Sequence, residues 1–77
     1  MARSSGLESD GAAMRNARIA AGLTITDVAE AAGVGTAYVS RLERGLQRNP
    51  SPPVLKRLAD ALGVPLVEIA VKDAVER

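Results

Sequence analysis

Apolar residues recur at helical spacing in five stretches of the chain, and glycine or proline separates each stretch from the next. The first stretch, GAAMRNARIAA, places Met14, Ala17 and Ala21 on one stripe. Asp10, or the serine before it, is a suitable N-cap, and Gly22 follows the end of the stretch. No stretch shows the apolar–polar alternation of a strand. The pattern predicts an all-α fold, a compact five-helix bundle.

A second and a third helix are predicted in quick succession. Thr24 and Asp27 have the spacing of a capping box at the start of the second helix. Gly33 is suited to end this helix in a left-handed conformation. Gly35 is then the N-cap of a third helix over residues 36–44. Two helices joined by so short a turn cross at a steep angle, and this arrangement is the helix-turn-helix.

The last two predicted helices follow a loop that contains prolines. Ser51 and Pro52 are typical N-cap and first residues for a fourth helix that extends to about Leu62. A fifth helix is predicted from Pro65 or Leu66 toward the C-terminus.

The fifth predicted helix carries apolar residues on two sides. One side closes the bundle, and the other is a stripe formed by Val67, Val71 and Val75. A helix that is apolar on two sides in so small a domain indicates a further contact, so we expect a homodimer interface at this stripe. In the alternative interpretation, the alanine-rich first helix leaves room for both sides in one core.

The chain divides into a short arm and one domain. Residues 1–10 are small and polar, and they predict a flexible N-terminal arm. Residues 11–77 form the predicted helix-turn-helix domain. Arg3 in the arm has two interpretations: terminal disorder, which is favoured, and a contact in the minor groove of DNA.

Composition excludes several classes of function. The 77 residues include no histidine and no cysteine, and Tyr38 is the single aromatic residue. The commonest catalytic bases and zinc ligands are therefore missing, so we expect no enzymatic activity, cofactor, metal site or small-molecule ligand. No apolar run approaches the roughly 20 residues that span a bilayer, and no signal-peptide pattern opens the chain. We expect a cytoplasmic protein with no membrane partner.

Charge is unevenly distributed, although the formal net charge is only +1. Residues 36–57 contain five basic residues and one acidic residue, whereas residues 1–35 and 58–77 each contain more acidic than basic residues. The central excess of positive charge indicates a surface that a polyanion could approach. A solvated basic loop explains the same density equally well.

The predicted third helix has two distinct sides. At about 100° per residue, Val39, Leu42 and Glu43 point one way. The opposite arc holds Thr36, Ala37, Ser40, Arg41 and Arg44. An α-helix fits the DNA major groove, where arginine can bind guanine with two hydrogen bonds and small side chains can contact a thymine methyl group. We therefore expect this helix to read bases.

Three motifs carry a resemblance to a known family: RNARIAAGLTITDVAEAAGV, YVSRLERG and NPSPPVLKRLADALGVPLVEI. From about Met14 to Ile69 the chain resembles the Cro/C1-type helix-turn-helix regulators, also called Xre-like. The resemblance implies a lambda-repressor-like fold of five helices. It also implies sequence-specific binding to operator DNA, commonly as a dimer.

The resemblance implies roles for individual residues. The base-reading positions correspond to Thr36, Ala37, Ser40 and Arg41. Contacts to the DNA backbone are implied for Thr24, Ile25, Arg44, Arg48 and Asn49. For Lys56 and Arg57, in the fourth helix, the charge pattern itself favours a helix face turned to water over a contact with phosphate.

Two further assignments concern the sides of the third helix. Arg18 and Glu43 match a family pair that ties the first helix to the third, and we expect a structural, partly buried ion pair. Tyr38 stands where the family commonly has threonine or serine. Its hydroxyl could reach a phosphate, or its ring could pack on the domain edge. Ile25 replaces a frequent glutamine, so a side-chain hydrogen bond to phosphate is lost there.

Two functions from different classes follow. The first is a sequence-specific regulator of transcription in a bacterium or phage. It would act at the nucleoid as a repressor, a homodimer on a palindromic operator. The alternative is a protein-interaction module, such as an antitoxin subunit or an adaptor, built on the same fold.

Overall fold

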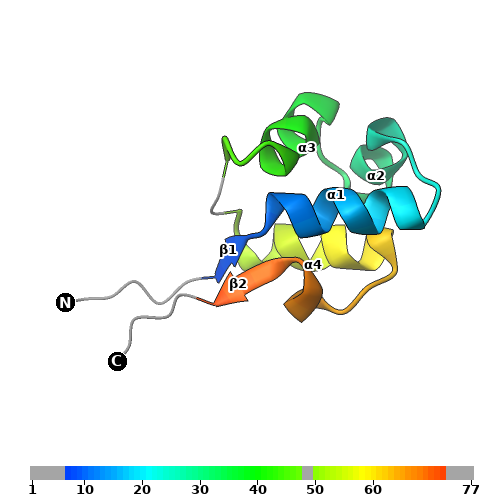
Figure 1. Cartoon of the computed structure of the whole chain (residues 1–77). Helices are drawn as coiled ribbons and strands as arrows, with labels where there is room; N and C mark the ends of the chain where they lie inside the picture. The colour runs from blue at the N-terminus through cyan, green and yellow to red at the C-terminus, as the bar shows by residue number, and fades with distance from the viewer. Residues whose placement is uncertain (1–6, 48–49, 73–77) are drawn as a thin grey trace.

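The computed structural model describes residues 7–47 and 50–72, which form four α-helices, one 3-10 helix and a two-stranded sheet (Figure 1). The elements in chain order are β1 (Leu7–Ser9), α1 (Gly11–Ala20), α2 (Ile25–Ala32), α3 (Thr36–Glu43), α4 (Pro52–Leu62), η1 (Leu66–Glu68) and β2 (Ala70–Lys72). Helices α2 and α3 lie over a layer formed by α1 and α4, and the two strands pair at one end of that layer. The predicted helix-turn-helix is therefore present as α2 and α3.

The helices begin and end at residues whose chemistry suits those positions. The Asp10 carboxylate accepts a hydrogen bond from the Ala13 N–H at 3.0 Å. In the capping box of α2, the Thr24 hydroxyl accepts from the Asp27 N–H at 3.0 Å, and the Asp27 carboxylate accepts from the Thr24 N–H at 2.9 Å. Gly33 ends α2 with a φ of 74°, which costs glycine no Cβ clash. The four predicted helices before residue 63 are confirmed.

The capping box also makes the start of α2 sensitive to acid. The backbone N–H of Thr24, helped by the Thr24 side chain, lowers the pKa of Asp27. A carboxyl group with a depressed pKa stabilises the folded state above its ordinary pKa, about 3.9 for aspartate. This stabilisation is lost as the pH falls through the depressed value, so the capping box is intact at neutral pH.

The core is aliphatic and draws on all four α-helices. Its members among the described residues are Met14, Val28, Ala29, Ala32, Val39, Leu42, Leu55, Leu58, Ala59, Leu62 and Ile69. Two of them, Val39 and Leu42, are fully buried and hold α3 against the rest of the domain. The opposite side of α3 is therefore free to face solvent.

The prediction of a fifth α-helix is wrong. Residues 66–68 form the short 3-10 helix η1, and the chain then extends into β2, which pairs antiparallel with β1. The register places Leu7 opposite Lys72, and the Asp10 N–H donates to the Ile69 carbonyl at 2.8 Å beside the ribbon. Pairing between the two ends of the domain satisfies backbone groups that a helix would have bonded internally.

Two further predictions change with this ribbon. Residues 7–9 of the predicted arm form β1, whereas residues 1–6, which include Arg3, lie outside the described residues. The valine stripe is not a helical face, because Val67 lies in η1 and Val71 in β2. Val75 lies outside the described residues. Val67 itself is 76% exposed, so it is accessible for a contact of another kind.

Helix α1 approaches the end of α3 very closely at Gly11. A Cβ atom at this position would lie 2.6 Å from the Glu43 carbonyl oxygen, and it would also collide with the Leu42 carbonyl oxygen. Both obstacles are backbone atoms, which cannot turn aside as a flexible side chain can. A residue without a Cβ atom is therefore required where the first turn of α1 meets the last turn of α3.

We predict that Gly11→Ala destabilises the domain by about 1–3 kcal/mol. The cost of overpacking exceeds the gain of at most about 1 kcal/mol from alanine's better helix propensity. The matched control is Gly35→Ser, at a position with nothing within 4 Å of an added Cβ, where the hydroxyl can cap α3 and stability is kept or rises. Urea unfolding followed by circular dichroism compares them. A Gly11→Ala variant as stable as the wild type would contradict this close approach.

Candidate nucleic-acid interface

Helix α3 presents one side to solvent along its whole length. Val39 and Leu42 on its other side are fully buried, which confirms the predicted two-sided character of this helix. The four predicted base-reading residues lie on the solvent side: Thr36, Ala37 and Arg41 are exposed, and Ser40 is half-buried. Their contacts with bases remain predictions.

The start of α3 is free of bulky groups. Its N-cap, Gly35, provides no side-chain hydrogen bond to the first turn. The next two residues, Thr36 and Ala37, are small and exposed. Base edges or phosphate oxygens can therefore come close to the backbone of this turn.

A two-pronged ion pair joins α1 to the last residue of α3. Arg18 Nε donates to Glu43 Oε2 at 2.7 Å, and Arg18 Nη2 donates to Glu43 Oε1 at 3.1 Å. Arg18 Nη1 also donates to the Leu23 carbonyl at 3.0 Å, so one guanidinium holds both α3 and the turn before α2. The two side chains are 15% and 5% exposed, and the hydrogen bonds to Glu43 raise the pKa of Arg18 above its ordinary value. This expected pair is present, and it fixes α3 relative to α1.

The residues predicted to contact the DNA backbone are in different situations. Arg44 is exposed at the C-cap of α3, and Thr24 is exposed at the N-cap of α2. Tyr38 is half-buried and packs against the core, as expected if its ring covers the domain edge. Arg48 and Asn49 lie outside the described residues.

Lys56 and Arg57 of α4 have partners within the domain. Lys56 Nζ donates to Asp60 Oδ1 at 2.8 Å in an exposed pair one helical turn apart. Arg57 Nε donates to the Ala32 carbonyl at 3.0 Å and so satisfies one of the last carbonyls of α2. Because each of these side chains has a partner within the domain, neither needs a contact with DNA to explain its position.

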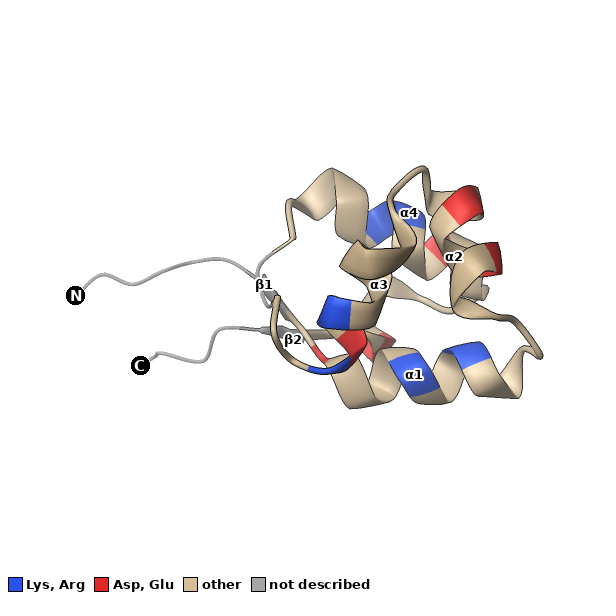
Figure 2. Cartoon of the chain, turned by 90° about the horizontal axis from the view of Figure 1, so that it is seen from above, with Lys and Arg blue, Asp and Glu red and all other residues tan. Residues whose placement is uncertain are grey.

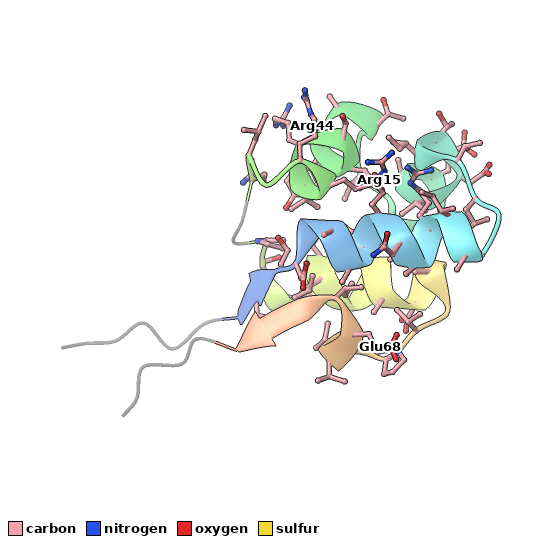
Figure 3. The ribbon with its side chains drawn as sticks, in the orientation of Figure 1. Arg15, Arg44 and Glu68 are labelled. Carbon is pink, nitrogen blue, oxygen red and sulfur yellow. The ribbon has the colours of Figure 1, made fainter. Side chains whose placement is uncertain are left out.

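Arg15 is a candidate functional residue that the sequence analysis missed. It is exposed on α1, three residues before Arg18, and therefore on the same side of that helix. Figure 3 shows Arg15 and Arg44 on the α3 side of α1, whereas Glu68 lies on the opposite side. The spacing of the two arginines in α1 is the signal that could have identified this residue.

A hollow of about 270 Å³ lies between α1 and α3. We call it the arginine hollow, and its lining residues are Arg15, Arg18, Ile25, Ser40, Glu43 and Arg44. Figure 2 shows basic residues on α1 and α3, an acidic segment at the end of α3 beside α1, and further acidic residues on α2. The arginine hollow and the exposed side of α3 together form a basic surface suited to an anionic partner.

A second hollow, of about 530 Å³, lies on the other side of α1. It is lined by four alanines of the α1 segment together with Asn16, Leu62, Val64 and Glu68. We call it the alanine hollow. Within residues 7–47 and 50–72, no group of three or more potential metal ligands occurs. In the same part of the chain, no helix is long and apolar enough to span a membrane.

We predict that Glu43→Gln destabilises the domain by about 3 kcal/mol, because it leaves the Arg18 guanidinium with little solvent and no counter-charge. Glu30→Gln is the matched control, since Glu30 is exposed on α2 and its loss should change stability by less than about 0.5 kcal/mol. Chemical denaturation at neutral pH measures both. Equal effects of the two substitutions would show that the ion pair does not hold α3.

The sequence matches the helix-turn-helix family model over residues 14–69. It is 39% identical over 59 residues to the HTH-type transcriptional repressor RghR of Bacillus subtilis, covering 77% of this chain and 44% of that protein. It is 37% identical over 67 residues to the transcriptional regulator ClgR of Mycobacterium tuberculosis, covering 87% of this chain and 58% of that protein. The chain thus spans about half the length of the curated relatives it matches.

A solved structure shows the same arrangement of helices. The crystal structure of SinR, a master regulator for biofilm formation, in complex with DNA superposes with a TM-score of 0.70 and 35% sequence identity. The match covers 74% of this chain and 90% of that chain. Because the family model and the relatives cover most of the sequence, the chain belongs to the Cro/C1-type, or Xre-like, helix-turn-helix family of transcriptional regulators.

Proposed function

We propose that this protein binds double-stranded DNA with sequence preference and represses transcription. The proposal rests on the exposed side of α3, where Arg41 stands among small side chains while Val39 and Leu42 are buried behind it. A helix of this kind enters the major groove, and an arginine there can bind guanine O6 and N7 together. Thr36 and Ala37 are small enough for close contact with base edges and thymine methyl groups.

Uncompensated positive charge supports the same proposal. Arg15, Arg41 and Arg44 are exposed and form no ion pair with any described residue. Contacts to phosphate position a protein on the duplex, and contacts to bases select the sequence. We assign Arg41, with Thr36, Ala37 and Ser40, to base reading, and Arg44 and Thr24 to the DNA backbone.

The relatives support a regulatory role in a bacterial cell. RghR is named as a transcriptional repressor, and SinR has been crystallised with DNA. A domain that occupies an operator represses transcription by excluding polymerase from the same DNA. We place this protein in the cytoplasm, at the nucleoid, and assign it to a bacterial or phage genome.

A homodimer on a palindromic operator completes the proposal. Two copies related by a two-fold axis would place their α3 helices about 34 Å apart, one turn of B-DNA. Val67 is 76% exposed in η1, which lies on the side of the molecule away from α3 (Figure 1). Together with the alanine hollow, Val67 offers an apolar surface where a second copy can pack without covering Arg41. An interaction module would use the same surface for another protein.

We predict that Arg41→Ala relaxes the preference at one base pair per half-site, at a cost of about 1–3 kcal/mol. Arg44→Ala should instead weaken binding to all sequences alike and reduce its salt dependence, because it removes a phosphate contact. Selection of bound duplexes from a random pool, followed by titrations at two salt concentrations, measures both effects.

Two outcomes would contradict this proposal. If Arg41→Ala and Arg44→Ala behaved identically, the division between base reading and backbone contact would be wrong. If the wild type bound no duplex even at low salt, the interaction module would be supported instead.

We predict that Val67→Glu converts a dimer into a monomer and weakens operator binding, because two carboxylates would be brought into an apolar contact. Ile19→Glu is the matched control: Ile19 is 56% exposed on α1 but does not line the alanine hollow. Sedimentation measures the mass of each variant. An unchanged mass for Val67→Glu would exclude Val67 from the dimer interface.

A further inference from the structure

We propose that Arg15 of α1 and Arg44 at the end of α3 grip one backbone phosphate of the duplex together, in the arginine hollow. This inference rests on the proposed function and extends it, because it gives α1 a direct role in binding DNA. The hollow lies between the two helices and is lined by both arginines.

The arginine hollow carries a net positive charge that nothing in the described chain neutralises. Glu43, the acidic residue in its lining, is fully engaged: both carboxylate oxygens accept hydrogen bonds from Arg18. Arg15 and Arg44 form no hydrogen bond or ion pair through their side chains with described residues. Two guanidinium groups thus border a hollow whose remaining ion pair is neutral, and such a site favours an anion.

The donors present match a phosphate. A guanidinium is a planar fork that can bind two phosphate oxygens at once, and it remains charged at every physiological pH. Arg15 brings one such group to the hollow from α1, and Arg44 brings another from the end of α3. Donors therefore face the hollow from α1 and from α3.

The C-terminal end of α3 does not compete strongly for these cations. The Ser40, Arg41 and Leu42 carbonyls already accept hydrogen bonds from the backbone N–H groups of residues 44, 46 and 45. The partial negative charge of this helix end is thereby reduced, and the Arg44 side chain is not required to cap it. Its guanidinium is available for a ligand.

The helices that carry the two arginines are fixed relative to each other. The Arg18–Glu43 ion pair and the close approach at Gly11 both join α1 to the end of α3. A phosphate held from both helices would therefore set the angle at which α3 enters the groove. This contact is independent of sequence, but it positions the base-reading residues.

The experiment replaces single phosphates of the selected operator duplex with neutral methylphosphonate linkages, one position at a time. Four proteins are titrated against each duplex: the wild type, Arg15→Gln, Arg44→Gln and Lys56→Gln. Lys56→Gln removes the same charge from α4, where Lys56 pairs with Asp60 instead of lining the hollow.

We expect one position per half-site where neutralisation weakens the wild type about tenfold, as for a lost hydrogen bond to a charged group. At that position Arg15→Gln and Arg44→Gln should each lose most of this sensitivity, because each variant lacks one of the two guanidinium groups that bind this phosphate. Lys56→Gln should keep the wild-type pattern.

Three results would overturn the inference. Arg15→Gln with the full wild-type sensitivity at every position would exclude Arg15, and if Arg41→Ala still altered base preference, the proposed function would stand alone. Loss of sensitivity at different positions in the two arginine variants would exclude a shared phosphate. No binding of any duplex by the wild type would remove the inference and the proposed function together.

Discussion

The attachment of α3 to α1 is the constraint on which the rest of the structure depends. An eight-residue helix is too short to be stable alone, so its position must come from tertiary contacts. Val39 and Leu42 are fully buried and anchor α3 in the common core. The Arg18–Glu43 pair supplies a directional part, since a bidentate ion pair allows one geometry where apolar packing allows several. Gly11 lets the two helices come close enough for both.

This attachment leaves one side of α3 without a structural task. The residues that hold the helix lie on its inner side, and the exposed side carries Arg41 and small groups. Three arginines lie beside this attachment. Arg18 forms the ion pair with Glu43, whereas Arg15 and Arg44 have no acidic partner among the described residues. Under the proposed function, neighbouring arginines of one surface thus have separate roles: Arg18 in stability, and Arg15 and Arg44 in binding DNA.

Local chemistry was sufficient to predict the four α-helices and their ends. The capping box at Thr24 and the left-handed Gly33 act within a few residues, so the sequence shows them directly. The ribbon of β1 and β2 could not be predicted in this way, because its hydrogen bonds join residues more than sixty positions apart. Val67, Val71 and Val75 lie four residues apart, and this spacing is also that of one side of a helix. The spacing of Arg15 and Arg18 could have placed Arg15 on the side of α1 that faces α3, but that Arg44 lies across the hollow is visible only in the structure.

The most direct test of the central claim is a titration of isotope-labelled protein with operator duplex, followed by the amide chemical shifts of the described residues. We predict large shifts for residues 36–41 and for the α1 turn around Arg15, and small shifts for α4 and η1. Shifts concentrated in η1 and around the alanine hollow, with α3 unmoved, would contradict the claim that the exposed side of α3 is the DNA-reading surface.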